Sequence, residues 1–213
     1  MLAHYAINLS LILYLVFYLP QLFHNIKHMA SNPPSFLFHT LMVVGAGCDV
    51  FYAVGQIHQW QYLVTSIVML MCMVVQHLQF AICHPKIKMS LSYKLLCVFM
   101  ILVVSCTLLA KYIEPFPVIW YLSAGWMMHV AYGYHLVPQI IQHYNVKSTL
   151  SLSMVYIFLS LLNSSLDWVS AIGFAWPEPS QMSIPIMIAL HFVIVWQWFL
   201  YHQKTKRYLS TCG

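Results

Sequence analysis

Seven long apolar segments divide this chain, and they constrain its fold more than any other feature. Each is close to the roughly 20 residues that an α-helix needs to cross the hydrocarbon core of a bilayer. Because lipid cannot hydrogen-bond to an exposed backbone, each segment is expected to be helical. The expected spans are Leu2–Phe23, Phe36–Gln56, Gln61–Ile82, Ser92–Lys111, Pro117–Gln142, Leu150–Phe174 and Ser183–His202.

Composition excludes an ordinary soluble domain. Apolar residues make up 62% of the 213 residues and charged residues 6%, whereas soluble domains average about 45–50% and about 25%. The net charge of +5 does not indicate nucleic-acid binding, because the basic residues are scattered between apolar segments. A soluble enzyme, a nucleic-acid-binding protein and a disulfide-rich secreted domain are therefore excluded. We expect one all-α membrane domain, 1–213, with the lipid bilayer as its surroundings.

The distribution of basic residues predicts the orientation in the membrane. One side receives eight of them: Lys27, Lys86, Lys88, Lys94, Lys147, Lys204, Lys206 and Arg207. The other side receives only Lys111, together with Glu114 and Glu178. The C-terminus should therefore be cytoplasmic and the N-terminus outside or lumenal, in either a bacterial inner membrane or an endolysosomal membrane. The first segment lacks a basic start, so we expect a retained helix rather than a signal peptide.

An internal repeat relates two parts of the chain at a constant offset of 118 residues. The offset pairs the motif Leu19-Pro20-Gln21 with Val137-Pro138-Gln139, and it pairs Asp49 with Asp167. Further pairs are Tyr14 with Tyr132, Gly55 with Gly173, Gln79 with Gln197, His84 with His202, Lys86 with Lys204 and Lys88 with Lys206. Spans one to three are therefore expected to repeat as spans five to seven.

This repeat predicts a 3+1+3 organisation. The first triple-helix repeat covers 1–90, a connector helix covers 91–116, and the second repeat covers 117–207. Three helices invert the chain and the fourth turns it back, so the two repeats should be parallel and related by an axis along the membrane normal. Parallel repeats of this kind occur in certain transporters, with the substrate site between them.

The paired motifs resemble the PQ-loop family, which includes cystinosin, the lysosomal cationic amino acid exporters and, more distantly, the SWEET sugar transporters. Tyr18-Leu19-Pro20-Gln21-Leu22 is similar to the first family motif. Val137-Pro138-Gln139, followed by Lys147-Ser148-Thr149, is similar to the second. The first copy departs from the family at Met29-Ala30-Ser31-Asn32-Pro33-Pro34, where a Lys-Ser-Thr-like stretch is usual. The resemblance covers nearly the whole chain and implies seven helices that transport a solute.

Each motif supplies a proline and a glutamine that we predict to form a hinge: Pro20, Gln21, Pro138 and Gln139. Proline within a helix lacks an N–H and clashes with the carbonyl four residues earlier. The carbonyls concerned are those of Val16 and Tyr134. A glutamine amide could bridge the freed backbone to another helix. A static kink is the alternative, and the paired occurrence favours a hinge that lets one bundle rock against the other.

The two acidic residues inside spans, Asp49 and Asp167, are the main candidates for substrate or proton binding. A charge near the bilayer centre costs on the order of 3 kcal/mol on insertion scales, so such residues usually face a cavity and serve a function. The alternative is a structural acid bonded to nearby backbone. Asn163 lies one helical turn before Asp167, whereas Gly45 stands at the equivalent place before Asp49. The second repeat should therefore hold the more functional carboxyl group.

Among the histidines, His77 and His129 are candidate cavity residues, because histidine can relay protons near neutral pH. The alternative for each is a polar side chain satisfied between helices. No cofactor and no metal site is expected. An enzyme is the least favoured class, because no nucleophile–base spacing or phosphate loop is visible in the sequence.

The favoured function is transport of a small polar metabolite, with an amino acid as the leading class. Two buried acids without a buried lysine or arginine favour cations or protons, so a cationic or proton-coupled carrier fits this pattern. A sugar carrier of the SWEET type is the nearest alternative, although sugars need no buried carboxylate. A seven-helix receptor or sorting protein is the alternative from another class. The expected partners are a small-molecule substrate and protons, with no nucleic acid.

The charge asymmetry predicts that the C-terminus is cytoplasmic. A reporter fused after Gly213 should therefore be active when it is of a kind that works only in the cytoplasm. A second reporter, active only outside the cytoplasm, should be silent at the same position. The reverse pattern would overturn both the orientation and the direction of the repeats.

Overall fold

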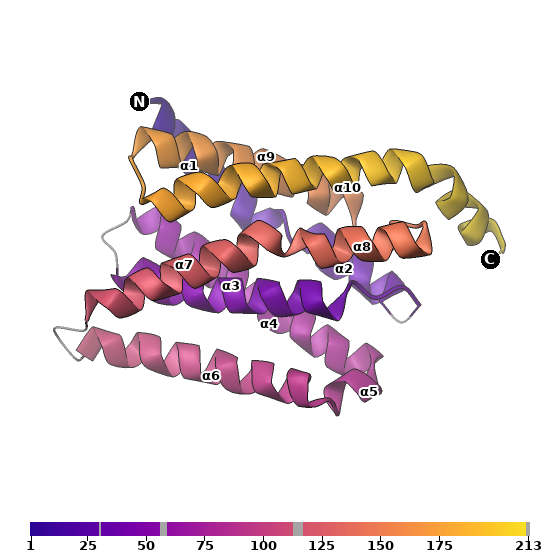
Figure 1. Ribbon diagram of the computed structural model, residues 1–213, viewed down its shortest axis with the longest axis horizontal. Helices are drawn as coiled ribbons and strands as arrows, with labels where there is room; N and C mark the ends of the chain where they lie inside the picture. The colour runs from indigo at the N-terminus through magenta and orange to yellow at the C-terminus, as the bar shows by residue number, and fades with distance from the viewer. Residues whose placement is uncertain (30, 56–58, 113–116, 212–213) are drawn as a thin grey trace.

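The computed structural model describes residues 1–29, 31–55, 59–112 and 117–211, which form a bundle of helices without a strand among them (Figure 1). The helices are α1 (Leu2–Val16), α2 (Leu19–His28), α3 (Phe36–Gly55), α4 (Trp60–Cys83), α5 (Pro85–Lys88), α6 (Leu91–Tyr112), α7 (Val118–Tyr134), α8 (Leu136–Val146), α9 (Met154–Gly173) and α10 (Glu178–Thr211). Three features named above lie outside the described residues. They are the expected span end at Gln56, the acidic residue Glu114 and the last part of the expected connector.

Six helical segments among the described residues are long and apolar enough to cross a membrane. They are Leu2–His28, Phe36–Gly55, Trp60–Cys83, Leu91–Ala110, Met154–Gly173 and Ser180–Tyr201. The expected fifth span is instead divided at His135 into α7, with 17 residues, and α8, with 11 residues. These two helices follow one another along the length of the bundle (Figure 1).

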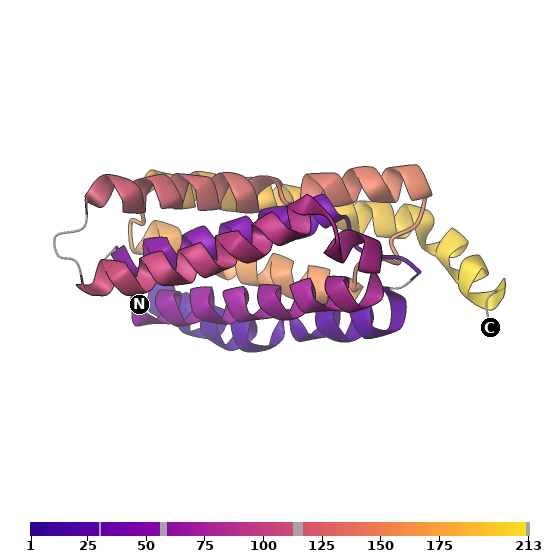
Figure 2. The same ribbon diagram turned by 90° about the horizontal axis from the view of Figure 1, so that it is seen from below.

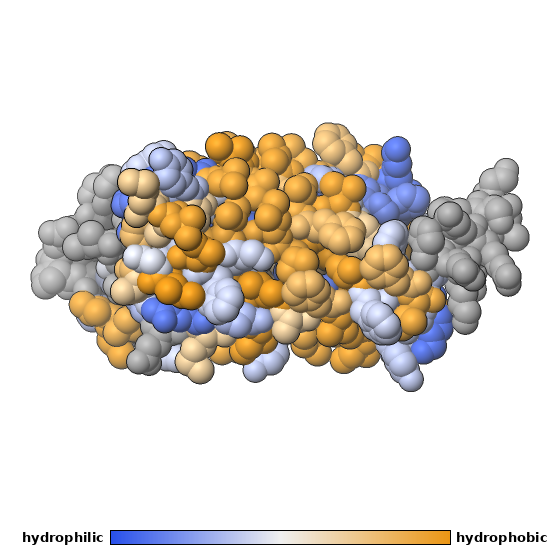
Figure 3. Space-filling model, turned by 90° about the horizontal axis from the view of Figure 1, so that it is seen from above, coloured by the Kyte–Doolittle hydropathy of each residue, from blue (hydrophilic) through white to orange (hydrophobic). Residues whose placement is uncertain are grey.

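The outer surface fits a multi-pass membrane protein. On the face drawn in Figure 3, apolar side chains cover most of the middle of the molecule, and most hydrophilic side chains lie toward its two ends. Large apolar residues of the outer helix α6, such as Leu95, Ile101 and Leu108, are more than half exposed. In water this exposure would be costly, whereas lipid tails solvate such side chains well.

The first and last expected spans differ from the helices in the structure. The first span is interrupted, since α1 ends at Val16 and α2 begins at Leu19. The last helix begins at Glu178 rather than at the expected Ser183. Pro179 lies in the first turn of this helix, where proline is tolerated because the N–H there has no partner within the helix. Helix α10 also continues past the expected end at His202.

The helices run roughly along one common direction, as the two perpendicular views show (Figures 1 and 2). Helix α1 packs on α9 and α4, and α7 packs on α3 and α10, while α6 lies against α3 at the edge of the bundle. The chain ends lie at opposite ends of the molecule (Figure 1). We call the end that holds the N-terminus and the starts of α4, α7 and α10 the N-terminal end. The end that holds α5 and the end of α8 is called the C-terminal end.

Close approach of α3 and α7 depends on two glycines. A Cβ atom added at Gly45 on α3 would lie 2.6 Å from ring atoms of Tyr132 on α7. Reciprocally, a Cβ atom at Gly125 on α7 would lie 2.7 Å from the ring of Tyr52 on α3. Each glycine therefore receives an aromatic ring from the other helix. Small residues at such contacts allow close helix packing in membranes.

Gly45→Ala should destabilise the fold because the added methyl group collides with the Tyr132 ring. Overpacking of this kind typically costs about 1–3 kcal/mol. The matched control is Gly133→Ala, because the nearest atom to a Cβ there is 4.0 Å away, on Ser183. Thermal unfolding of the detergent-purified protein should show a lower midpoint for Gly45→Ala and an unchanged or higher midpoint for Gly133→Ala. Equal midpoints for both variants would contradict the packing described here.

Candidate functional site

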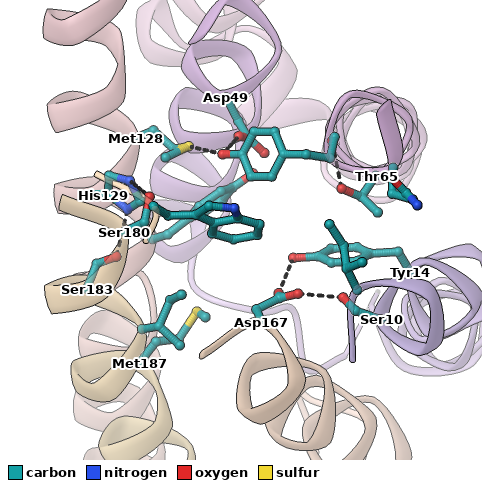
Figure 4. Close-up of a pocket in the computed structure, with 16 residues that line it drawn as sticks. Ser10, Tyr14, Asp49, Thr65, Met128, His129, Asp167, Ser180, Ser183 and Met187 are labelled. Carbon is teal, nitrogen blue, oxygen red and sulfur yellow. Dashed lines mark hydrogen bonds between the residues drawn. The ribbon is translucent and has the colours of Figure 1, made fainter. Parts of the chain in front are cut away.

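A cavity of about 70 Å³, with room for a few water molecules or a small solute, lies between the helices toward the N-terminal end. Residues of α1, α3, α4, α7, α9 and α10 line it (Figure 4). Both acids singled out in the sequence, Asp49 on α3 and Asp167 on α9, are among the lining residues. The two carboxyl groups therefore face one common space, although 118 residues separate them in the chain.

The Asp167 carboxyl group is surrounded by hydrogen-bond donors. Ser10 Oγ on α1 donates to its Oδ1 at 2.5 Å, and Tyr14 Oη on α1 donates to its Oδ2 at 3.1 Å (Figure 4). Asn163 Nδ2, one turn earlier on α9, donates to Oδ2 at 3.3 Å. Asn163 thus contacts Asp167 but is not among the residues that line this cavity. Three hydrogen bonds from two helices therefore fix the orientation of the Asp167 carboxyl group.

The Asp49 carboxyl group has a different partner. The hydroxyl of Tyr62 on α4 donates to its Oδ1 at 2.6 Å. The same hydroxyl also lies 3.5 Å from the Met128 sulfur on α7. At Gly45, where the second repeat has Asn163, the space is filled by the Tyr132 ring. A partner for Asp49 therefore comes from a neighbouring helix rather than from one turn earlier on its own helix.

His129 joins α7 to the first turns of α10 at the cavity wall. Its Nδ1 lies 2.6 Å from Ser183 Oγ, and its Nε2 lies 3.1 Å from Ser180 Oγ (Figure 4). Serine hydroxyls can donate or accept, so this pair can hold the imidazole ring in either neutral tautomer or as a cation. The expectation that His129 faces a cavity agrees with the structure.

His77 lies away from this cavity. It packs between α4, α3 and α6, where its Nδ1 is 2.9 Å from His39 Nε2 and its Nε2 is 3.2 Å from Cys97 Sγ. Its ring stacks on Tyr93 at 3.9 Å between centroids. The cavity residue Tyr62 is fifteen positions earlier on α4, which corresponds to roughly 22 Å of helix at about 1.5 Å per residue. His77 is therefore too near the C-terminal end of the bundle to share the cavity.

Both Pro-Gln motifs coincide with breaks in their helices. Helix α1 ends at Val16 and α7 ends at Tyr134, the two residues whose carbonyls stand four positions before a proline. The chain then resumes as α2 and α8, with Pro20 and Pro138 in the first turn of each. The breaks follow from the clash between a proline ring and the carbonyl four residues earlier.

The two glutamines cross the bundle to the start of another helix. Gln21 Oε1 accepts a hydrogen bond from the backbone N–H of Ser153 at 2.8 Å, and Gln21 Nε2 donates to the Ser151 carbonyl at 3.3 Å. Gln139 Oε1 accepts from the backbone N–H of Ser35 at 2.9 Å. We call these five residues the glutamine clasp. These hydrogen bonds reach the start of a different helix rather than the freed carbonyls of Val16 and Tyr134, which corrects the bridging role expected for the amides.

The contacts of the two glutamines are related by the same offset of 118 residues that relates the two halves of the sequence. Ser35 and Ser153 are 118 residues apart, as are Gln21 and Gln139. A second pair of equivalent bonds lies nearby. These bonds run from Gln79 Nε2 to the Leu22 carbonyl and from Gln197 Nε2 to the Ile140 carbonyl, both at 3.0 Å. Equivalent residues therefore make equivalent contacts in the two halves.

Several site residues were not identified from the sequence. The Asp49 carboxyl group is contacted by Tyr62, and His129 is contacted by Ser180 and Ser183. No sequence motif marks these three residues. The serine pair of the clasp, Ser35 and Ser153, does carry a signal, because the offset of 118 residues relates the two.

The fold and the site define a helical membrane protein with an internal cavity that two carboxyl groups line. Residues 121–180 match the family described as PQ loop repeat. This match covers most of α7, all of α8 and α9, and the start of α10, and it confirms the resemblance seen in the second motif. No curated protein matches the chain.

Proposed function

We propose that this protein is a transporter that carries a small polar metabolite across a membrane by alternating access, with an amino acid as the favoured class. One observation carries the proposal. Asp49 and Asp167, which occupy equivalent positions in the two halves, line a single cavity in a bundle that the glutamine clasp holds together near its other end. Buried ionisable groups on a cavity inside a membrane bundle usually bind ions, protons or substrates.

In this proposal the chain has the 3+1+3 organisation, with repeats at 1–90 and 117–207 and a connector at 91–116. Two observations support it. The clasp bonds are equivalent under the offset of 118 residues. The main packing is also reciprocal, because α1 of the first half packs on α9 of the second, while α7 of the second half packs on α3 of the first.

The orientation in the proposal follows the basic residues, with the C-terminal end in the cytoplasm and the cavity nearer the outer or lumenal side. A bacterial inner membrane and an endolysosomal membrane both suit this orientation. The clasp would then be the inner gate, closed in this structure. The helix breaks before Pro20 and Pro138 would serve as the hinges about which the two triple-helix bundles rock.

The cavity chemistry suits a solute that carries a positive charge. Among the described residues that line the cavity there are two carboxyl groups and no lysine or arginine. A substrate ammonium group could pair with Asp167, while a proton could be carried by either carboxyl group. Tyr14 and Tyr62 would keep these groups oriented through their hydroxyl hydrogen bonds.

Uptake into proteoliposomes tests this function. The purified protein should accumulate one or more radiolabelled amino acids from a panel that also contains sugars, and an imposed proton gradient should increase the initial rate. Empty liposomes give the background. Saturable uptake of sugars alone would replace the amino acid proposal with the sugar carrier, and uptake of neither class would reject both.

In the same assay, Asp167→Asn should abolish gradient-driven uptake. The variant keeps the shape and much of the hydrogen bonding of the side chain but removes its charge and its titration. Removing a buried charge need not destabilise a membrane helix, so expression should stay near normal. Exchange that persists at equal pH on both sides would assign Asp167 to proton transfer, whereas complete loss of substrate binding would assign it to the substrate.

The matched control is Ser165→Ala on the same helix. Its hydroxyl bonds only locally, to the Leu161 carbonyl at 2.9 Å, so its removal should leave uptake unchanged. Full gradient-driven uptake by Asp167→Asn would contradict the role of Asp167, and Asp49→Asn would then be expected to abolish uptake instead.

A further inference from the structure

The two halves of the glutamine clasp differ at one buried position. One turn after Gln21 the first motif has Asn25, whereas one turn after Gln139 the second motif has His143. The two residues are 118 positions apart and are 1% and 0% exposed, so they occupy equivalent buried places. Asparagine does not titrate, but histidine gains a proton in the physiological range. A titratable group therefore lies beside the second half of the clasp, whereas the equivalent place beside the first half has none.

The hydrogen bonds of the Gln139 amide determine the protonation state of His143 in the closed clasp. A backbone N–H can only donate, so the Gln139 atom that faces Ser35 N at 2.9 Å must be the amide oxygen. The amide nitrogen of Gln139 then faces His143 Nε2 at 2.9 Å. That nitrogen is a donor, so His143 Nε2 must be an acceptor. The closed clasp thus requires a neutral imidazole ring with its proton on Nδ1.

Ser151 closes the same small network. Its hydroxyl lies 3.0 Å from His143 Nε2 and 2.7 Å from Gln139 Nε2. A serine hydroxyl could turn and accept from a protonated Nε2. The amide of Gln139 could not turn, because a flipped amide would place its NH₂ group against the N–H of Ser35. Protonation of His143 therefore leaves two donors facing each other at 2.9 Å, which only separation of the groups can relieve.

The first half of the clasp has no such conflict. Gln21 Nε2 donates to Asn25 Oδ1 at 2.7 Å, and Asn25 Nδ2 donates to Gln79 Oε1 at 2.9 Å. Every group in this chain is an amide, so its donors and acceptors stay matched at any physiological pH.

The described surroundings of His143 supply neutral amides and hydroxyls rather than a carboxylate that would hold its cation. On α10 the side chain of Gln197 lies within hydrogen-bonding reach of the ring. Toward the same end of the bundle, the elements around the clasp also carry Tyr144 and Lys147 at the end of α8, Tyr201 on α10, Lys27, His24 and His28 on α2, and His39 on α3. Lys147 Nζ lies 3.4 Å from the centre of the Tyr144 ring and 5.8 Å from that of Tyr201. His24 is bonded to the Leu150 carbonyl and His39 to His77.

We propose that His143 makes the glutamine clasp a proton-operated gate, which opens at the C-terminal end of the bundle when this histidine is protonated. The ring is fully buried while the clasp is closed, so a proton binds when the clasp opens transiently. The bound proton then prevents the clasp from closing again, which shifts the population toward the open state. This gate is independent of which solute the cavity carries.

Hydrogen–deuterium exchange of the full-length protein, without any substrate, tests the gate. The amide protons to follow are those of Ser35 and Ser153, which the clasp protects. His143→Asn restores in the second half the residue present in the first, and it serves as the reference at every pH. The result is expressed as the ratio of the wild-type exchange rate to the variant exchange rate. The direct effect of pH on the chemistry of amide exchange is the same in both proteins and cancels in this ratio.

We expect this ratio to rise as the pH falls below about 6.5, the ordinary pKa of histidine, by up to about tenfold per pH unit. The rise should occur at both serines, because the two bundles move as units. His28→Asn, which changes another histidine at the same end, should keep the wild-type response. If His143→Asn does not fold, His143→Gln provides the reference, since its amide oxygen can accept from Gln139.

A ratio that does not change with pH would overturn the gate, and so would a rise confined to Ser35. Because the measurement needs no substrate, it remains decisive even if the uptake assay rejects the proposed transport function.

Discussion

One constraint shapes this structure more than any other. In lipid, every polar backbone group needs a hydrogen-bond partner within the protein. A regular helix meets this need alone, but the two Pro-Gln motifs interrupt α1 and α7 in the middle of the bundle. The buried glutamine that follows each proline then bonds to backbone at the beginning of a distant helix. Because unpaired groups are so costly in lipid, the interruption and the contact across the bundle are best regarded as one feature.

The same requirement explains how two carboxyl groups can be accommodated inside the bundle. Each lies beside a tyrosine hydroxyl, from α1 for Asp167 and from α4 for Asp49. These donors come from neighbouring helices, so a relative movement of the helices would change the surroundings of each acid. In the proposed transporter, such a movement would let the cavity bind a cation in one conformation and release it in another.

Much of the fold could be predicted from the sequence, because hydropathy reports burial in lipid and proline reports a backbone break directly. The helix ends at Val16 and Tyr134 follow from the proline positions, and the shared cavity of the two acids agrees with their equivalent places in the repeat. The partner of Asp49 could not be predicted, since Tyr62 is brought to it by lateral packing of α4 on α3. For the same reason the sequence did not show that His77 faces α3 and α6.

The two halves of the molecule share most of their key contacts but differ at one titratable side chain. The contacts that satisfy the backbone are equivalent in the two halves, as the paired bonds of Gln79 and Gln197 illustrate. The two acids of the cavity are paired in the same way, whereas a buried histidine, His143, stands beside only one half of the clasp. A symmetric framework allows two bundles to move by similar amounts about a shared axis. Direction can then come only from side chains that differ between the halves, since two identical halves would respond identically to a proton from either side.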